Sequence, residues 1–328
     1  MNPILALIIA NLIWGAASPI FKFALQNIPP FTLAFIRFFF AGITLIPFIK
    51  NFDIKLSGKE WMELILGAFF GISINITFFF WGLQRAESIN APIIASSGPV
   101  FLFFLSVLFL KEKPQLKVFF GMIIALIGVI LIILSPILFD GKTFAFGELQ
   151  GNLFFVLATL GAVMHPLLQK NVIAKIGSFK VTFVSFLISA VTFYPFMFIE
   201  LRSWSILQLN IQGWIGILFG VFLSSALAYF LFNYGIAKIK TQEVGLFTYI
   251  DPIVAVLIAI PLLHEYPTIH FFIGSLLVFG GIFLAEGRIH WHPIHKLKIK
   301  NSSPPVILGS EATPESILDR TSDVHKPE

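Results

Sequence analysis

Ten apolar stretches, each long enough to cross a lipid bilayer, occupy almost the whole chain before residue 290. A hydrocarbon core about 30 Å thick needs roughly 20 apolar residues in an α-helix, because each residue advances the helix by about 1.5 Å. Long apolar runs, rather than segments of alternating polarity, favour helices over a β-barrel. The predicted spans are residues 3–25, 30–49, 61–83, 89–110, 115–136, 149–171, 180–199, 213–236, 243–263 and 269–287.

The composition makes lipid the solvent for most of this chain. Hydrophobic residues make up 57% of the 328 residues and charged residues only 12%, and the mean hydropathy is +0.90. A water-soluble fold of this size would have too few polar side chains to cover its surface. We therefore predict an all-α integral membrane protein with ten transmembrane helices. The first span has no basic start, so we expect it to stay in the mature protein rather than act as a signal peptide.

One pattern occurs twice along the chain at a constant offset. Pro99 recurs as Pro252 and Glu112 recurs as Glu265, in each case 153 residues later. Each half then holds five spans, which is an odd number, so the second half must enter the bilayer in the opposite sense to the first. The sequence predicts two inverted five-helix repeats and a disordered cytoplasmic tail, with the boundaries 1–143, 144–287 and 288–328.

The basic residues predict the orientation in the membrane. The connections at 50–60, 111–117, 170–180 and 238–240, together with residues 288–300, carry 15 Lys and Arg. The intervening connections carry only Arg85, Lys142 and Arg202. Because Lys and Arg are enriched in cytoplasmic loops, we predict a multi-pass protein of the cell membrane with both termini in the cytoplasm. The net charge of +5 then reflects topology, and nucleic acid is not an expected partner.

The two repeated prolines predict breaks in the fourth and ninth spans. A proline inside a helix removes the hydrogen bond to the carbonyl four residues earlier, so Pro99 and Pro252 would free the carbonyls of Ala95 and Thr248. Inverted-repeat transporters place broken helices around a substrate site near the bilayer midplane. The alternative is a packed kink whose carbonyl is satisfied by a hydroxyl or a water. The polar candidates beside these breaks are Ser96, Ser97, Thr248, Tyr249 and Asp251.

Several other spans carry polar or aromatic residues on one face. In the first span, Asn11, Trp14 and Ser18 recur at helical spacing, so they share a face. This face either lines a cavity or packs against neighbouring helices, where small and mildly polar residues are common. Trp14 lies near mid-depth, away from the interfaces, and therefore favours the cavity. By the same reasoning, the further substrate-binding candidates are Asn75, Tyr229 and Asn233.

Three ionisable residues lie inside spans, where a charge is costly and is a functional hypothesis by default. They are Arg37, His165 and Asp251. By helical rise, the long guanidinium of Arg37 can reach the carboxylate of Asp251. This pair is either a structural ion pair or, alternatively, a proton-coupling site or a substrate-carboxylate anchor. His165 either donates to a neighbouring helix or lines the pathway.

Charged residues near the ends of spans have simpler interpretations. Glu112 and Glu265 each precede a proline by two residues at the end of a helix, so we interpret them as residues that fix loops. Lys22 lies within a turn or two of the predicted outer surface. Its ammonium can extend to water while its aliphatic stem stays in lipid.

These residues resemble a known family, the ten-helix EamA-type members of the drug/metabolite transporter superfamily. The resemblance covers residues 1 to about 287 through Trp14-Gly15, Lys22, the run that ends at Arg37, and the duplicated Pro…Glu-x-Pro pattern. It implies spans one, three, four, six, eight and nine around a central cavity, with spans five and ten towards the periphery. One departure is that Gly161 stands opposite Trp14, where the family often repeats the tryptophan. This departure argues against an aromatic sandwich made by both halves.

The function that the resemblance implies is secondary transport. The expected partners are the lipid bilayer and a small-molecule substrate, such as an amino acid or a related compound, moved by alternating access and often outward. A passive channel is the alternative, and a homodimer is left open. An intramembrane enzyme is disfavoured, because the sequence has no His-Glu-x-x-His, phosphate-loop or Gly-x-Ser-x-Gly motif. No metal site or cofactor is expected.

Overall fold

The computed structural model describes residues 1–49, 51, 53–101, 116–138, 145–238 and 247–286, and these residues are helical with short connections. Over these ranges no β-strand is present. The helices, with 3-10 and π segments labelled η, are α1 (Pro3–Ala24), α2 (Pro30–Leu45), η1 (Ile46–Phe48), α3 (Gly58–Ala68), η2 (Phe69–Ile74), α4 (Asn75–Leu83), α5 (Asn90–Ser96), α7 (Leu116–Leu138), α8 (Ala145–Ile176), α9 (Ser178–Glu200), η3 (Ile206–Gln208), α10 (Ile211–Leu218), η4 (Phe219–Leu227), α11 (Ala228–Ile236), η5 (Phe247–Tyr249), α13 (Ile250–Leu263) and α14 (Ile269–Glu286).

Most predicted spans correspond to helices of suitable length. Seven stretches of the described chain are long and apolar enough to cross a membrane, and two shorter apolar helices cover Phe247–Leu263 and Ile269–Ala285. The predicted all-α membrane fold is therefore confirmed. The fourth predicted span is described only as far as Phe101, and Glu112 and the tail over 288–328 lie outside the described residues.

Local sequence signals set where several helices begin. The Asn2 side chain accepts a hydrogen bond from the Ile4 amide at 2.9 Å, and Pro3 occupies the first helical position of α1, where its missing N–H costs nothing. At the start of α3, Ser57 and Glu60 cap each other, with the Glu60 carboxylate accepting from the Ser57 amide at 2.7 Å. These caps satisfy N–H groups that the helix itself leaves without partners.

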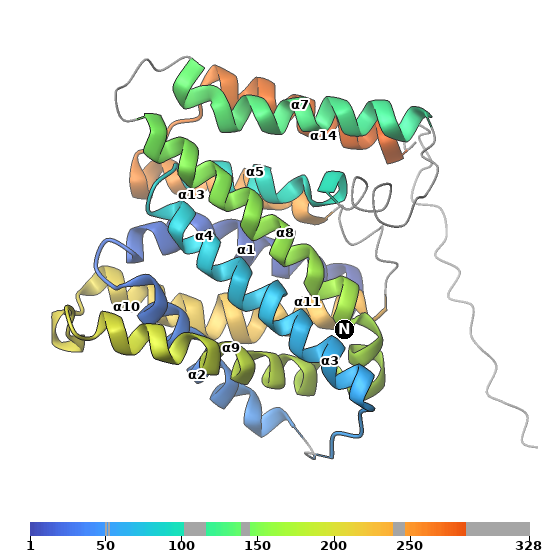
Figure 1. Ribbon diagram of the computed structural model, residues 1–328, viewed down its shortest axis with the longest axis vertical. Helices are drawn as coiled ribbons and strands as arrows, with labels where there is room; N and C mark the ends of the chain where they lie inside the picture. The colour runs from blue at the N-terminus through green and yellow to red at the C-terminus, as the bar shows by residue number, and fades with distance from the viewer. Residues whose placement is uncertain (50, 52, 102–115, 139–144, 239–246, 287–328) are drawn as a thin grey trace, which may run out of the picture. The chain divides into compact units, whose positions relative to one another are not determined.

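The helices pack in pairs that are distant in sequence (Figure 1). In the folded unit Met1–Ile289, α7 runs beside α14, α2 beside α9, and α1 packs against both α11 and α13. The α7–α14 contact uses glycines that recur at the same offset of 153 residues, since Gly121 and Gly128 recur as Gly274 and Gly281. A Cβ atom on Gly128 would lie 2.6 Å from the carbonyl oxygen of Gly274, and one on Gly121 would lie 2.5 Å from that of Gly281. Only glycine allows the two backbones to approach this closely.

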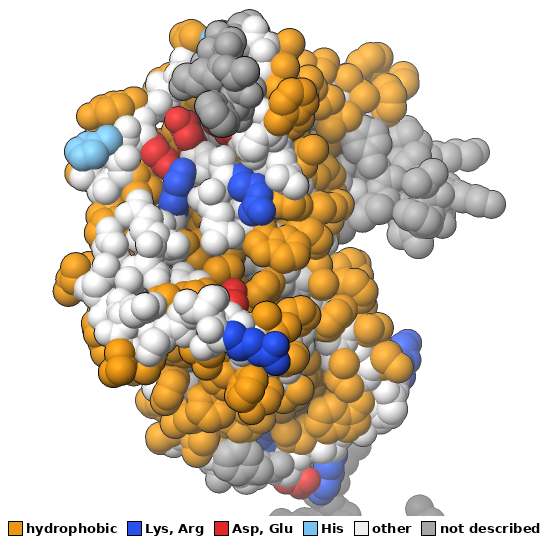
Figure 2. Space-filling view, turned by 60° about the vertical axis from the view of Figure 1, so that its left-hand side comes forward, with side chains coloured by type: hydrophobic (Ala, Val, Ile, Leu, Met, Phe, Trp, Pro, Cys, Tyr) orange, Lys and Arg blue, Asp and Glu red, His pale blue; other side chains and the backbone are white. Residues whose placement is uncertain are grey.

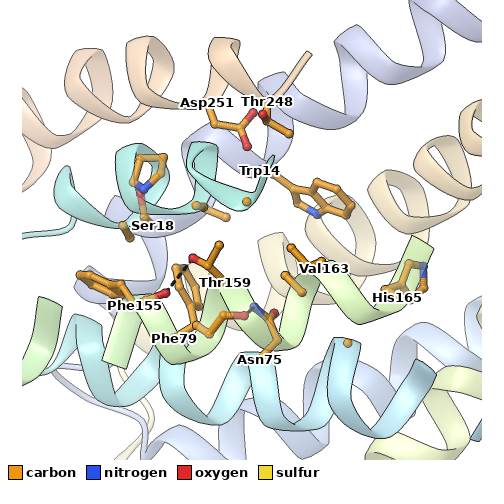
Figure 3. A pocket seen from close by; sticks show the side chains of 18 of the residues that line it. Trp14, Ser18, Asn75, Phe79, Phe155, Thr159, Val163, His165, Thr248 and Asp251 are labelled. Carbon is orange, nitrogen blue, oxygen red and sulfur yellow. Dashed lines mark hydrogen bonds between the residues drawn. The ribbon is translucent and has the colours of Figure 1, made fainter. Parts of the chain in front are cut away.

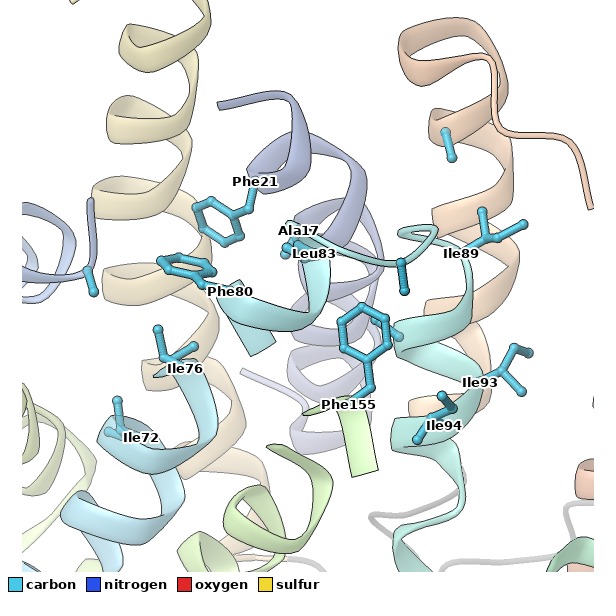
Figure 4. Packing of buried hydrophobic residues seen from close by; sticks show 14 of the residues in the cluster. Ala17, Phe21, Ile72, Ile76, Phe80, Leu83, Ile89, Ile93, Ile94 and Phe155 are labelled. Atoms are coloured by element: carbon cyan, nitrogen blue, oxygen red, sulfur yellow. The ribbon is translucent and has the colours of Figure 1, made fainter. Parts of the chain in front are cut away.

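Apolar side chains fill the spaces between helices and also cover the outside. In Figure 4, Phe21 of α1, Phe80 of α4 and Phe155 of α8 pack among aliphatic side chains of α4 and α5. Hydrophobic side chains also dominate the face shown in Figure 2, where charged side chains are few. Large apolar residues such as Val191 and Leu276 are 74% and 73% exposed. A surface of this kind suits lipid as its solvent.

Candidate substrate-binding cavity

A cavity of about 690 Å³ lies among the helices of this bundle. Its size falls in the range of small-molecule sites, roughly 300–1,000 Å³. Trp14, Phe79 and Phe155 are among the side chains that surround it in Figure 3, with Asp251 and Thr248 on one side and Asn75 on the other. Its aromatic lining residues are Trp14, Phe21, Phe79, Phe155, Tyr229 and Phe232. Its polar and charged lining residues are Ser18, Arg37, Asn75, Thr159, His165, Ser224, Thr248 and Asp251.

Trp14 holds its place through contacts with the second half of the chain. Its indole N–H donates to the carbonyl of Ser224 at 3.1 Å. Its ring lies 5.1 Å from that of Tyr229 and 4.9 Å from that of Phe232, both on α11. Gly161 of α8 instead lets α8 approach the carbonyl of Phe70. The aromatic neighbours of Trp14 thus come from the eighth span.

Two π-helical segments, η2 and η4, border the cavity within the third and eighth spans. π-Turns widen a helix by one residue and occur often at functional sites. Gly71 of η2 lines the cavity, and the Cβ of a larger residue there would lie 2.6 Å from the Cβ of His165. In η4, the adjacent residues Ser224 and Ser225 both direct their hydroxyls to the same side chain of α2.

That side chain is Arg37, which is only 2% exposed. Its Nε donates to the Ser225 hydroxyl at 2.6 Å and its Nη2 donates to the Ser224 hydroxyl at 3.1 Å. The guanidinium carbon lies 4.6 Å from the ring centroid of Phe21 and 4.8 Å from that of Phe38. Hydroxyls and aromatic rings hold a cation in position without cancelling its charge. The Nη1 nitrogen has no hydrogen-bond partner among the residues that the structure describes.

The expected ion pair between Arg37 and Asp251 is not formed. Both side chains are described and line the same cavity, but no ion pair joins them. The physical reason lies in the packing: α2 packs against α9 and η4, which brings the serines to Arg37, whereas α13 packs against α1. Gly15 allows this second contact, because a Cβ there would lie 2.8 Å from the Asp251 carbonyl. Helical rise gives depth but not the lateral position of a helix.

His165 combines a cavity position with a structural bond. Its Nε2 lies 2.8 Å from the Asn233 amide oxygen, and the Asn233 amide nitrogen donates to the Thr182 hydroxyl at 2.7 Å. An amide oxygen only accepts, so Nε2 is the donor in this chain of contacts. Over the described ranges, the Nδ1 atom of His165 has no hydrogen-bond partner. His165 therefore bonds to a neighbouring helix and also lines the cavity.

Several predicted site residues lie outside the cavity lining. The Asn11 amide donates to the Leu7 carbonyl of its own helix at 2.8 Å, and the Ser97 hydroxyl donates to the Ile94 carbonyl at 2.5 Å. Such bonds satisfy polar groups within the bundle, which is the packing alternative considered above. The predicted residues that do not line the cavity are Asn11, Ser96, Ser97, Asn233, Tyr249 and Pro252.

Both repeated prolines lie next to interruptions of helical structure. Helix α5 ends at Ser96, and Pro99 lies in the helical turn that follows. Helix α13 begins at Ile250 after η5, so Pro252 lies in its first turn, where a missing N–H is tolerated. The Ser96 hydroxyl lies 3.3 Å from the Thr248 carbonyl as well as 2.8 Å from the Pro92 carbonyl. The two interruptions therefore contact each other across the repeats.

Away from the cavity, Lys22 and Glu265 form a compact polar cluster. The Lys22 ammonium lies 2.6 Å from a Glu265 carboxylate oxygen and donates to the Ala86 carbonyl at 2.7 Å. The other carboxylate oxygen accepts from the Ser88 hydroxyl at 2.6 Å, from the Ser88 amide at 2.8 Å and from the Ile89 amide at 3.4 Å. Glu265 thus fixes loops, as predicted. The Lys22 ammonium is bound by a buried carboxylate, and its side chain is 26% exposed.

Several residues of the cavity lining were not predicted from the sequence. Phe21, Phe79, Phe155 and Phe232 are four of 40 Phe residues, and no periodicity distinguishes them from those that face lipid. Ser224 could have been predicted more readily, because two adjacent serines, Ser224 and Ser225, stand out in an apolar span. Over the described ranges, no group of three or more His, Cys, Asp or Glu side chains is arranged to hold a metal ion.

Comparison with known proteins gives consistent relatives. The chain is 28% identical over 291 residues to YetK, an uncharacterized transporter of Bacillus subtilis, covering 87% of this chain and 86% of YetK. It is 26% identical over 290 residues to an uncharacterized transporter of Archaeoglobus fulgidus, covering 87% and 98% of the two chains. It is 24% identical over 264 residues to an S-adenosylmethionine uptake transporter of Rickettsia bellii, covering 78% and 84%.

A solved structure and a family model extend this agreement to the fold. One crystal structure of a protein matches with a TM-score of 0.62 at 16% sequence identity, covering 88% of this chain and 99% of the solved chain. The model of the EamA-like transporter family matches twice, over residues 1–134 and 149–286. These two matches include most of the helices that surround the cavity. We conclude that this multi-pass membrane protein belongs to the EamA-like transporter family, within the drug/metabolite transporter superfamily.

Proposed function

We propose that the protein is a secondary transporter that moves small organic metabolites, amino acids or related compounds, out of the cell by alternating access. The observation that carries the proposal is the cavity of about 690 Å³ inside a membrane-spanning bundle, with aromatic walls and a few convergent polar groups. Such a lining suits compact organic solutes better than bare ions. The names of the relatives also favour a transporter over an enzyme.

The mechanism that we propose uses two inverted five-helix repeats, residues 1–143 and 144–287. The two separate matches of the family model, to residues 1–134 and 149–286, support this division. Transporters of this kind expose a fixed midplane site to each side by rocking one repeat against the other. The contact between the Ser96 hydroxyl and the Thr248 carbonyl lies where the two helix interruptions meet. We propose that the two repeats move relative to each other about this contact.

The proposed orientation places both termini in the cytoplasm of a cell membrane, as the distribution of Lys and Arg indicates. The Lys22–Glu265 cluster then lies on the outer side. It joins the end of α1 to the connection after α13 and to the connection before α5. Opening the cavity outward would require these elements to separate. A homodimer stays a prediction from the sequence, and the bilayer and one small solute are the other proposed partners.

Counterflow in proteoliposomes tests the proposal. Purified protein is reconstituted with a panel of unlabelled amino acids and related metabolites inside, and the entry of the same labelled solute is measured. A carrier accelerates entry when its substrate is present on the opposite side. A passive channel, the alternative function, gives flux that the internal solute does not stimulate. Absence of exchange for every solute of the panel, from a monodisperse protein, would contradict the proposal.

The Trp14→Ala variant connects this activity to the cavity. Because the indole lines the cavity and bonds to Ser224, its removal should abolish exchange or shift it to other substrates, while the protein still inserts. Trp214→Ala is the matched control, since Trp214 is 50% exposed and does not line the cavity. Wild-type exchange kinetics in Trp14→Ala would remove Trp14 from the transport site.

A further inference from the structure

Two charged side chains of opposite sign line the cavity and do not neutralise each other. We propose that Arg37 and Asp251 recognise the two ends of a zwitterionic substrate, with its carboxylate at Arg37 and its ammonium group at Asp251. This inference rests on the proposed function, and it assigns the residues that select the substrate's charges. It follows from the state of each side chain and from the lining as a whole.

Arg37 is fixed in position but incompletely paired. The serine hydroxyls occupy Nε and Nη2, and the rings of Phe21 and Phe38 lie against the guanidinium. Because these neighbours are neutral, none supplies the negative charge that a buried cation requires. The remaining Nη1 has no hydrogen-bond partner in the part of the chain that the structure describes, although the residue is only 2% exposed. A carboxylate in the cavity would supply both the missing acceptor and the missing charge.

Asp251 is the negatively charged side chain of the cavity lining. Among the described residues its carboxylate makes no ion pair, and its buried Oδ1 has no hydrogen-bond partner there. It lies in the first turn of α13, where the helix dipole favours a negative charge. Lys22, the cation of the neighbouring helix α1, is bound by Glu265. An ammonium group in the cavity would therefore give Asp251 its counter-charge.

The two charges together define the class of substrate. Arg37 and Asp251 are the only Lys, Arg, Asp or Glu side chains among the described residues that line the cavity. A simple anion would be repelled by Asp251, and a simple cation would be repelled by Arg37, whereas a zwitterion complements both. The Ser18 hydroxyl, which also has no hydrogen-bond partner among the described residues, adds one neutral hydrogen-bonding group. The aromatic side chains of the lining would contact the apolar part of the substrate.

The test uses two matched series of solutes that share an apolar part and carry a carboxylate, an ammonium group or both. The first is phenylalanine, 3-phenylpropanoate and 2-phenylethylamine, and the second is leucine, 4-methylpentanoate and 3-methylbutylamine. Counterflow of each is measured in wild-type proteoliposomes, and binding is measured by the thermal shift of the detergent-solubilised protein. We expect the zwitterion of at least one series to exceed both partners by about tenfold or more, which corresponds to about 1.4 kcal/mol.

Two variants that each remove one charge test which residue binds which end of the substrate. Asp251→Asn should abolish the preference for the zwitterion over the acid, and Arg37→Gln should abolish the preference over the amine. Asp53→Asn is the control, since the Asp53 side chain is 58% exposed and outside the cavity, and its selectivity should equal that of the wild type. If Arg37→Gln does not fold, Asp251→Asn still decides, because Asp251 has no partner to lose.

The outcomes separate this inference from the proposed function. Equal use of acid, amine and zwitterion by the wild type would overturn the inference and leave transport intact. A preference for the acid or the amine over the zwitterion in both series would do the same. A wild-type ratio of zwitterion to acid in a folded Asp251→Asn protein would also overturn it. Loss of all exchange and all thermal shifts in the wild type would refute both proposals.

Discussion

Two pairs of opposite charges in this bundle have opposite fates. Lys22 and Glu265 meet at 2.6 Å, and the remaining carboxylate oxygen is filled by donors from Ser88 and Ile89. Arg37 and Asp251 line one cavity, yet no ion pair joins them, and each retains a polar atom without a hydrogen-bond partner among the described residues. Lining the same cavity therefore does not by itself produce an ion pair.

The different pairing of the two sets of charges indicates a different role for each region. A buried ion pair is favourable only when further hydrogen bonds satisfy both partners, and the Lys22–Glu265 cluster meets this condition. It joins three elements and so serves the structure. Leaving two charges unpaired in a cavity lowers stability unless something else binds there. The incomplete pair is the one expected to bind a substrate, and substitutions at both pairs and at the serines that bind Arg37 test this contrast.

The largest effect on stability is expected for Glu265→Ala. The change leaves the Lys22 ammonium without its counter-charge and removes the acceptor of the Ser88 and Ile89 amides. Breaking a buried pair in this way costs about 3–5 kcal/mol, and we expect the lower end because the Lys22 side chain is 26% exposed. Thermal unfolding in detergent measures the loss.

The exposed pair Lys55–Asp53 gives the matched control for that measurement. Its charged atoms are 2.9 Å apart, but the two side chains are 85% and 58% exposed. A surface pair contributes about 0–1 kcal/mol, so Asp53→Ala should leave the unfolding temperature nearly unchanged. Equal losses for Glu265→Ala and Asp53→Ala would show that the Lys22–Glu265 cluster has no structural role.

An intermediate effect is expected for Ser225→Ala. Its hydroxyl accepts from Arg37 Nε at 2.6 Å, and a hydrogen bond to a charged group contributes about 1.5–3 kcal/mol. Ser224→Ala should cost less, because the corresponding distance to Nη2 is 3.1 Å. Chemical denaturation of the two variants gives the comparison. If Ser224→Ala proved the more harmful, the Nη2 contact with the Ser224 hydroxyl would be the stronger of the two.

The smallest effect on stability is expected for Asp251→Asn. Since the carboxylate makes no ion pair, its replacement by an isosteric amide removes no partner, and the unfolding free energy should change by less than about 1 kcal/mol. Substrate selectivity should change far more than stability. A loss as large as that of Glu265→Ala would mean that Asp251 is a structural residue, and the contrast between the two pairs would disappear.

The sequence predicted the helices much better than the contacts between them. Apolar length predicted the spans that became α1, α2, α7, α9 and α14 within a few residues. Among the residues that it predicted for the site by helical face or position, Trp14, Ser18 and Tyr229 line the cavity. It did not predict that Ser224 and Ser225 would bind Arg37, or that Asn233 would bind His165.

The physical reason is the range of the interactions. Hydrophobicity, helix caps and prolines act within a few residues, so the sequence by itself determined an all-helical membrane fold and the twofold pattern around Pro99 and Pro252. Side chains such as Arg37 and Ser225, which are 188 residues apart, come into contact only once the helices are packed in their final arrangement. That arrangement depends on packing between whole helix surfaces, including the glycine contacts of α7 and α14. Only the tertiary structure therefore decided which charges were paired and which were left facing the cavity.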